Sequence, residues 1–283
     1  MGKIVNYSEI TALLETSVFL TDGGSGTKKI SGKKLLQALA EVSDDVNLHK
    51  NVYGGRSLGT SVTADQWAQI TAGTFHGMLV GDYWTINGVK WIIADFDYWL
   101  HCGDTECVKH HLVMIPETCL YNAKMNDTNI TTGAYIGSAM YTTNLASAKT
   151  TIDTAFGSAH ILSHRERFAN AVTDGVETGG AWVDSKVDLM NEIMVYGSNI
   201  FHNCINGTRW PDGNYTIDKT QLALFRLDNT KIVAFYNNNR APWWLRDVTN
   251  GSAFANVYAS GSAGCSNASD SYGVRPAFGI FGS

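Results

Sequence analysis

The chain has 283 residues, of which 44% are hydrophobic and 17% charged, and its formal net charge is −5 at pH 7. This composition is typical of a globular protein with a sizeable core, and it argues against a nucleic-acid partner because phosphate binding needs clustered Lys and Arg. The N-terminus carries no signal-peptide core and no apolar run approaches a membrane span, so we expect a soluble protein made in the cytoplasm, without membrane insertion. The cysteines are odd in number and irregularly spaced, which makes a disulfide framework improbable.

The first fifty residues predict a small module that differs from the rest of the chain. Residues 8–16 indicate a short amphipathic helix capped by Ser8, and residues 17–31 indicate two short strands joined by a Gly-rich turn at 22–26. A second helix is expected over 32–42, with an apolar face made of Leu35, Leu36, Leu39 and Val42. Such a module buries little on its own, so this face is expected to pack on copies of itself, on another protein, or on the main domain.

Residues 51–59 are interpreted as a linker, after which the main domain begins with a helix. Thr63 and Gln66 form a capping box ahead of that helix. Residues 82–100 then predict a hairpin, because Asn87-Gly88 is the preferred pair for a tight two-residue turn and aromatic or β-branched residues flank it.

The remaining elements indicate an α+β fold. After a strand over 110–116, the spacing of apolar residues predicts helices over 143–162 and 184–197, the second with Val187, Met190, Ile193 and Met194 on one face. Strands are then expected over 223–227, 231–236, 243–248, 254–259 and 273–278. A hairpin, then helices, then a run of short strands differs from the alternating pattern of α/β proteins.

The segment from Asp247 to Tyr272 has an unusual composition. It consists mainly of Ser, Ala, Asn and Gly with two tyrosines, and it contains no Lys, Arg, Glu, Leu, Ile, Met or Pro. A spacer of this composition would be disordered. Here, however, apolar Phe254 and Val257 lie within the segment, and apolar sequences that predict strands flank it on both sides. We therefore expect an ordered backbone whose intervening side chains face outward, although composition alone also fits a surface loop without a partner.

The sequence "WWLRDV…FANV…GVRPAF" resembles the end of the variable proteins of diversity-generating retroelements, which have a C-type-lectin fold. Upstream stretches such as "MNDTNITTGAYIGSAM" and "GGAWVDSKVDLMNEIMVYG" are similar to tail and virion proteins of phages of gut Firmicutes. The resemblance implies an α+β, C-type-lectin-like (formylglycine-generating-enzyme-like) domain over 55–283. It also implies that residues 1–54 form a β-hairpin and helix module for oligomerisation or virion attachment.

The same resemblance implies a hypervariable receptor-binding protein of a phage particle, located in the virion and acting by binding without chemistry, cofactor or metal. Its expected partners are a host-cell surface protein or glycan and other virion proteins, in a homotrimeric assembly. The alternative is a structural virion protein that is not diversified. The positions with the family's variable character are Thr249, Asn250, Ser252, Asn256, Tyr258, Ser260, Ser262, Cys265, Ser266, Asn267, Asp270 and Tyr272. The expected invariant frame comprises Trp243, Trp244, Leu245, Arg246, Phe254, Gly273, Val274, Arg275 and Pro276.

Catalytic and metal-binding functions have less support in the sequence than receptor binding. Zinc donors are present at His101, Cys102, Cys107, His110 and His111, but their spacing departs from the usual zinc patterns, and structural burial is the simpler interpretation. A formylglycine-generating enzyme would need two reactive cysteines near the C-terminus, where only Cys265 lies, with Cys204 well upstream.

Other ionisable groups give no better catalytic pattern. His160, His164 and Glu166 lack the zinc-protease order and are interpreted as a solvated helix face. Glycan hydrolysis would need paired carboxylates, and no spacing singles out Asp95, Asp97 or Asp104. A calcium site is left open, because no carboxylate cluster requires one.

Overall fold

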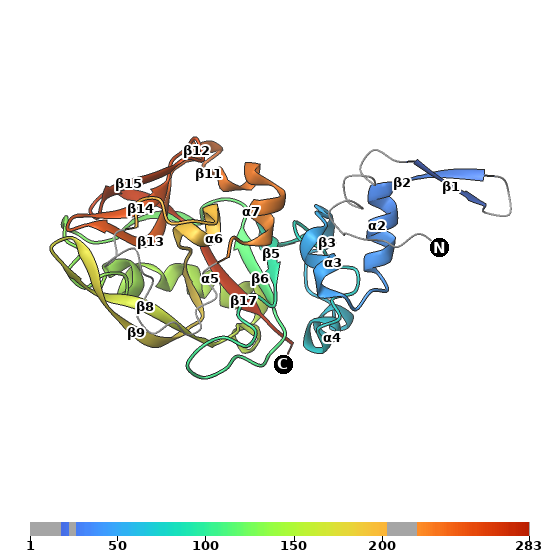
Figure 1. The fold of residues 1–283 in the computed structure, drawn as a ribbon, viewed down its shortest axis with the longest axis horizontal. Coiled ribbons are helices and arrows are strands. Elements are labelled where there is room, and N and C mark those ends of the chain that lie inside the picture. Colours follow the sequence, from blue (N-terminus) through green and yellow to red (C-terminus); the bar gives the residue numbers. More distant parts are fainter. Residues whose placement is uncertain (1–17, 23–26, 203–219, 283) are drawn as a thin grey trace.

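The structure is a computed structural model that describes residues 18–22, 27–202 and 220–282 (Figure 1). In this part of the chain, helices and mainly antiparallel sheets build an α+β fold, as the sequence predicts. The larger sheet has six described strands in the order β10(Val187–Leu189)-β17(Pro276–Ile280)-β6(Leu112–Pro116)-β5(Val89–Phe96)-β4(Tyr83–Ile86)-β3(Ser57–Gly59). The smaller has five, in the order β15(Ala263–Asn267)-β14(Ala253–Val257)-β13(Trp243–Asn250)-β16(Ser271–Val274)-β7(Tyr121–Lys124).

Three hairpins and several helices surround these sheets. The hairpins are β1(Val18–Asp22)–β2(Thr27–Ser31), β8(His164–Thr173)–β9(Val176–Ser185) and β11(Ala234–Tyr236)–β12(Asn239–Ala241). The described α-helices are α2(Gly32–Ala40), α3(Val46–Asn51), α4(Ala64–Ala72), α5(Ala146–Phe156), α6(Glu192–Tyr196) and α7(Ala223–Leu227). A π-helical turn spans Met140–Asn144, and 3-10 turns span Ser158–His160 and Asn229–Ile232. No helix in the described ranges is long and apolar enough to cross a bilayer.

Strand β13 packs against a separate core on each of its faces. Trp243 and Leu245 belong to the core shared with the larger sheet, whereas Trp244 and Val248 belong to a second core that includes Tyr135 of the loop before α5. Successive side chains of a strand point to opposite faces, so a strand covered on both sides has a continuous apolar run instead of an alternating one. This double burial explains the sequence Trp243-Trp244-Leu245 and fixes the strand in place.

Several predicted elements are confirmed. Strands β1 and β2 pair as a hairpin, and α4 has the complete capping box between Thr63 and Gln66. Strands β4 and β5 are joined by the Asn87-Gly88 turn, where both residues have positive φ (52° and 78°), as this type of turn requires. The predicted helix at 8–16 and the turn at 23–26 lie outside the described residues.

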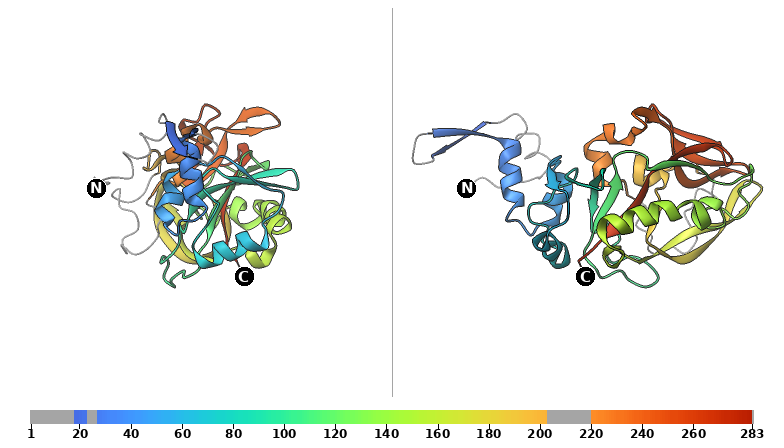
Figure 2. Two further views of the ribbon diagram at one scale, coloured as in Figure 1. Left: turned by 90° about the vertical axis from the view of Figure 1, so that its right-hand side faces the viewer. Right: turned by 180° about the vertical axis from the view of Figure 1, so that it is seen from behind.

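The N-terminal segment differs from the prediction in two ways. The interpretation of residues 51–59 as a linker is wrong, because β3 joins the larger sheet beside β4 and Tyr53 forms a bridge to Val80. On α2, Leu36 is buried but Leu39 is exposed, and Val42, just after the helix, is also exposed. Leu36 packs in a small cluster that Leu79 of the main domain completes, while the β1–β2 hairpin stands apart from both sheets (Figures 1 and 2). The division at residue 54 stays a prediction.

In the middle of the chain the predicted helix over 184–197 is wrong in its first half. Residues 187–189 form β10 beside β17, and only residues 192–196 are helical. Residues 223–227, expected as a strand, form α7. The β8–β9 hairpin was not expected, and it places His164 and Glu166 on a strand instead of the predicted helix face. The runs at 187–189 and 223–227 are short enough to fit both periodicities, and tertiary packing decides between them.

The close approach of β16 to the chain after β6 requires a glycine at position 273. A Cβ there would overlap the sulfur of Cys119 and lie 3.1 Å from the carbonyl oxygen of Pro242. Gly251 offers a matched control, because the nearest heavy atom to a Cβ at that position is 3.9 Å away.

We therefore expect Gly273→Ala to lower the free energy of unfolding by about 1–3 kcal/mol, the usual cost of overpacking a core. Gly251→Ala should change it by less than about 0.5 kcal/mol. Urea denaturation of both variants measures the difference, and equal stabilities would contradict the close packing of β16.

Candidate functional site

The predicted variable positions spread along the sheet formed by β13–β16. At one end, Tyr258, Ser260 and Ser262 belong to the turn between β14 and β15. At the other end, Asn250, Ser252, Asn267 and Asp270 lie around the opposite turns, where the Asn250 side chain accepts hydrogen bonds from the backbone N–H and hydroxyl of Ser252 (both 2.9 Å). The structure thus places both groups on turns of one sheet, not on unrelated parts of the molecule.

A chain of hydrogen bonds crosses the middle of this sheet. The amide of Asn256 donates to the Ser266 hydroxyl (2.8 Å), which donates to the Tyr272 hydroxyl (3.2 Å). The Tyr258 ring lies over Gly264, where a Cβ would overlap it and approach the Asn256 oxygen to 2.6 Å. A glycine at 264 is therefore what allows these side chains, drawn from three strands and a turn, to come together.

Two of the predicted positions are not outward-facing, and for them this expectation is wrong. Asn256 is fully buried, and its Oδ1 has no hydrogen-bond partner among the described residues. Thr249 is also buried and donates to the carbonyl oxygen of Ala253 (3.1 Å). Burial follows because Asn256 is opposite Trp244 in the register and shares its covered face. Ser252, Cys265, Ser266, Asp270 and Tyr272 are half-buried, and the remaining five are exposed. A ligand-binding role for the twelve stays a prediction.

A groove of about 1050 Å³ opens beside the β14–β15 turn, and we call it the hairpin groove. It is lined by residues 229–233 and by the β11–β12 hairpin, which Figure 1 places next to β14 and β15. The turn with Ser260 and Ser262 also lines it, as do Glu117 and Thr118. Exposed Phe235 gives the groove an aromatic side chain, and Lys231, Arg240 and Arg275 give it positive charge.

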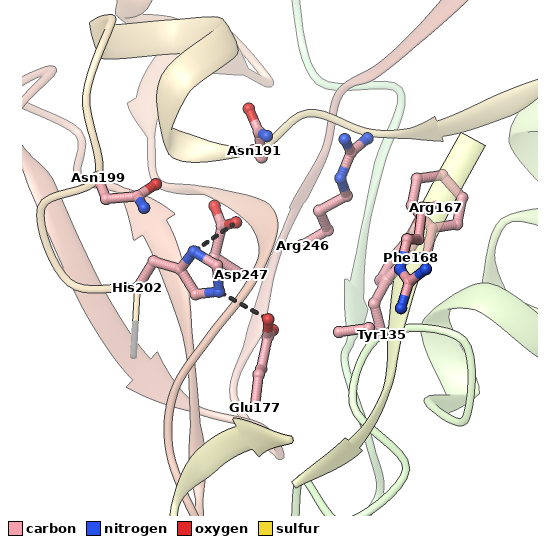
Figure 3. A pocket seen from close by; sticks show the side chains of 10 residues that line it. Tyr135, Arg167, Phe168, Glu177, Asn191, Asn199, His202, Arg246 and Asp247 are labelled. Carbon is pink, nitrogen blue, oxygen red and sulfur yellow. Dashed lines mark hydrogen bonds and ion pairs between the residues drawn. The ribbon is translucent and has the colours of Figure 1, made fainter. Parts of the chain in front are cut away.

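A polar network includes Arg246 and Asp247 of β13, and Figure 3 shows His202 between Asp247 and Glu177. The His202 ring lies between two carboxylates, with Nε2 2.6 Å from Glu177 and Nδ1 3.7 Å from Asp247. The Glu192 carboxylate accepts hydrogen bonds from the backbone N–H groups of residues 200–202, and Asp247 accepts one from the N–H of Glu192 (2.6 Å). These contacts hold the segment after α6 against the sheet.

The charges in this network strongly perturb its titration. Burial alone would lower the pKa of His202, but the hydrogen bond to Glu177 and the negative charges of Asp247 and Glu192 raise it to about 9. Burial alone would raise the pKa of Glu166, yet the adjoining charge of Arg246 and the contact with His164 lower it to about 2. Arg246 donates to Glu166 over 2.6 Å within the core. Glu177 and Glu166 therefore each have a positively charged partner, whereas Glu192 is held by backbone N–H groups.

Among the described residues, the cavity beside this network is small. The cavity between His202, Arg246 and Tyr135 has a volume of about 30 Å³, enough for a water molecule but not for a sugar or peptide. The contacts of the His202 ring with Glu177 and Asp247 link the segment after α6 to β9 and β13. This network was not predicted from the sequence. The pair Arg246-Asp247 in an otherwise apolar strand could have indicated it, since charges in a buried strand need partners of opposite charge or hydrogen bonds.

The zinc candidates each have other partners. His110 contacts Asp97 (2.7 Å), whereas His111 is buried and accepts the backbone N–H of Trp99 on Nε2 (3.1 Å). Burial lowers the pKa of His111 to about 3, which suits a neutral ring that accepts a hydrogen bond. Among the described residues no group of three or more His, Cys, Asp or Glu side chains is arranged to hold a metal ion.

The remaining catalytic candidates do not come together. His160 stacks on Trp67, with ring centroids 4.1 Å apart, and His164 contacts buried Glu166. Cys204 lies outside the described residues, so its distance from half-buried Cys265 is not defined. The three aspartates have separate structural contacts: Asp95 with Lys50 and the N–H of Ala223, Asp97 with His110, and Asp104 with Arg165.

Comparison with known proteins gives one family match. Residues 206–281 match the model of a domain of unknown function, DUF6273. The matched range contains α7, the β11–β12 hairpin and strands β13–β17, and hence the hairpin groove apart from Glu117 and Thr118. No curated protein and no solved structure matches the chain.

The position of His202 leads to a test by pH. Because its pKa is higher in the folded protein than the ordinary 6.5, its stabilising effect is complete below about pH 6.5 and is lost as the pH rises through 9. Between these values the free energy of unfolding should fall more in the wild type than in His202→Gln, by on the order of 3 kcal/mol. Urea denaturation across the range measures this, and parallel profiles would contradict the buried ion pairs.

Proposed function

We propose that this protein is a hypervariable receptor-binding protein of a phage particle that recognises a host-cell surface molecule through the β13–β16 sheet and the adjoining hairpin groove. The observation that carries the proposal is the exposure of polar and aromatic side chains, such as Tyr258, Ser260 and Ser262, at one end of a sheet whose central strand is fixed by two cores. A rigid scaffold of this kind tolerates changes in the residues it presents.

The chemistry of the exposed positions suits recognition. Tyrosine supplies a large contact area at low entropy cost, and Ser and Asn supply adaptable hydrogen bonds, a combination that antibody loops also use. Here Tyr258 is 42% exposed, and the hydroxyls of Ser260 and Ser262 lie 2.8 Å apart at the mouth of the hairpin groove. A C-type-lectin-like arrangement of the domain is part of this proposal and rests on the sequence resemblance.

We further propose that the N-terminal module assembles the protein as a homotrimer or attaches it to the virion. Leu39 and Val42 at the end of α2 are 46% and 74% exposed, although neighbouring Leu36 and Ala40 are buried. Two large apolar side chains in water, next to a hairpin that stands apart from the sheets, support a surface that another chain covers. Several linked copies would strengthen weak contacts with a cell surface.

A structural virion protein without diversification is the second candidate. The burial of Asn256 and Thr249 favours it, because freely exchanged residues at these positions would disturb the core. The coding DNA distinguishes the two candidates. Diversification requires a near-copy of the final segment that differs mostly at adenines, close to a reverse transcriptase gene. Absence of this copy would favour the structural protein.

Exchange of the presented residues provides the functional test. We expect the combined change Tyr258→Ser, Ser260→Tyr and Ser262→Asn to reduce binding to host cells at least tenfold and to change the free energy of unfolding by less than about 1 kcal/mol. The matched control is Asn256→Leu, which should lower stability because Ser266 loses its hydrogen-bond donor. Flow cytometry with labelled protein measures binding, and unchanged binding by the triple variant would reject this surface as the receptor site.

The assembly is tested separately. Leu39→Gln combined with Val42→Gln should convert a trimer into monomers without loss of folding, because both side chains are exposed in the single chain. Sedimentation velocity gives the mass and circular dichroism gives the folded fraction. A variant that keeps the mass of the wild type would exclude this face from assembly.

A further inference from the structure

Arg275 places a buried positive charge in the wall of the hairpin groove. Its side chain is fully buried, with Nε donating to the carbonyl oxygen of Pro116 (3.0 Å) and Nη1 to that of Lys231 (2.8 Å). The remaining nitrogen, Nη2, has no hydrogen-bond partner among the described residues. A guanidinium has donors in a planar fork suited to a carboxylate, so an unused nitrogen next to a groove indicates an incomplete anion site.

The charge of Arg275 is also not neutralised by an ion pair. None of the ion pairs in the described part of the chain includes Arg275. The faces of Trp243 and Phe225 lie 5.2 and 5.8 Å from its guanidinium carbon and offer partial compensation. Burial nevertheless lowers the pKa of Arg275 to about 10, because the negative charge of Glu117 offsets only part of the desolvation, and the charged form lacks full electrostatic stabilisation. A bound anion would supply it.

The rest of the groove adds to this positive potential. Glu117 contributes a carboxylate to the groove lining, and this carboxylate forms ion pairs with Lys231 (3.3 Å) and Lys90 (2.8 Å). Arg240 on β12 also lines the groove, is exposed, and forms no ion pair with a carboxylate among the described residues. Although the whole chain has a net charge of −5, this groove therefore attracts anions.

We infer that the hairpin groove binds an acidic saccharide, with a carboxylate of the sugar at Arg275 and Arg240. The inference deepens the proposed function and rests on it, because it names the chemical class of the receptor. The neutral lining supports a sugar over an acidic peptide: amides at Asn229 and Asn238 and hydroxyls at Ser260 and Ser262 match ring hydroxyls. Exposed Phe235 offers an apolar ring for the C–H face of a pyranose.

The test compares trigalacturonate with its methyl ester by isothermal titration calorimetry on the full-length protein. The two probes have the same size and hydroxyls and differ in charge. We expect trigalacturonate to bind at least thirtyfold more tightly than the ester, and binding to weaken with added salt because the contact is between charges. Equal affinities for the two probes, or no binding of trigalacturonate, would overturn the inference.

Variants then locate the site. Arg240→Gln should weaken trigalacturonate binding at least tenfold, whereas Lys109→Gln removes the same charge from a residue outside the groove and should leave affinity unchanged. Arg275→Lys keeps the charge but loses the fork, and should also weaken binding at least tenfold. Because Arg275 is buried, the thermal unfolding of the Arg275→Lys variant is measured in parallel with binding. If that variant unfolds, Phe235→Ala at the exposed edge provides a second groove variant. Unchanged affinity in Arg240→Gln and Phe235→Ala would overturn the inference.

Two further results separate this inference from the proposed function. If triglutamate binds more tightly than trigalacturonate, the ligand is an acidic peptide and the saccharide assignment is wrong. If no acidic probe binds while the Tyr258, Ser260 and Ser262 variant still loses attachment to cells, the receptor-binding function stands and the acidic-saccharide inference fails.

Discussion

The rest of the structure depends on how β13 carries two adjacent charges into the interior. Arg246 and Asp247 lie in a strand that is buried on both faces, and an unpaired charge there would cost several kcal/mol. Arg246 is paired with Glu166 on β8, and Asp247 contacts His202 and the start of α6. These pairs hold the long β8–β9 hairpin and the segment after α6 against the central strand.

The candidate binding surface uses the stiffness that results. Residues at the ends of β13–β15 are held by strand pairing and by two hydrophobic cores, so their side chains are presented without the entropy cost of ordering a flexible loop. The hairpin groove adds concavity and charge to an otherwise polar surface. Both features lie within or next to the range that matches DUF6273.

Local patterns predicted part of this architecture. The capping box at Thr63 and the turn at Asn87-Gly88 depend on a few neighbouring residues, so the sequence alone determines them. The apolar run at Leu222–Leu227 suits a helix or a strand equally well, and its packing beneath β5 decided for α7. Outward-facing side chains were predicted at twelve positions of the closing segment, of which five are exposed. Asn256 instead faces a second core whose existence depends on distant residues such as Tyr135 and Phe168.

The groove and the interior network could not have been assembled from sequence. Arg275 comes close to Lys231 and Pro116 through pairings that link strands far apart in the chain. Likewise, His202 reaches Glu177 across a hairpin that the periodicity did not indicate. Long-range contacts of this kind leave only an indirect trace, in the form of charged residues within apolar strands.

The hydrogen-bonded chain from Asn256 through Ser266 to Tyr272 restricts how these three positions can evolve. Groups that share one network have coupled energies, so the effect of a change at one position depends on the residues at the other two. A serine that accepts a hydrogen bond from the asparagine at position 256 can become a defect once that asparagine is replaced. Neutral drift at these sites is therefore expected to be epistatic, with compatible triplets selected together, while the exposed turn residues change one at a time.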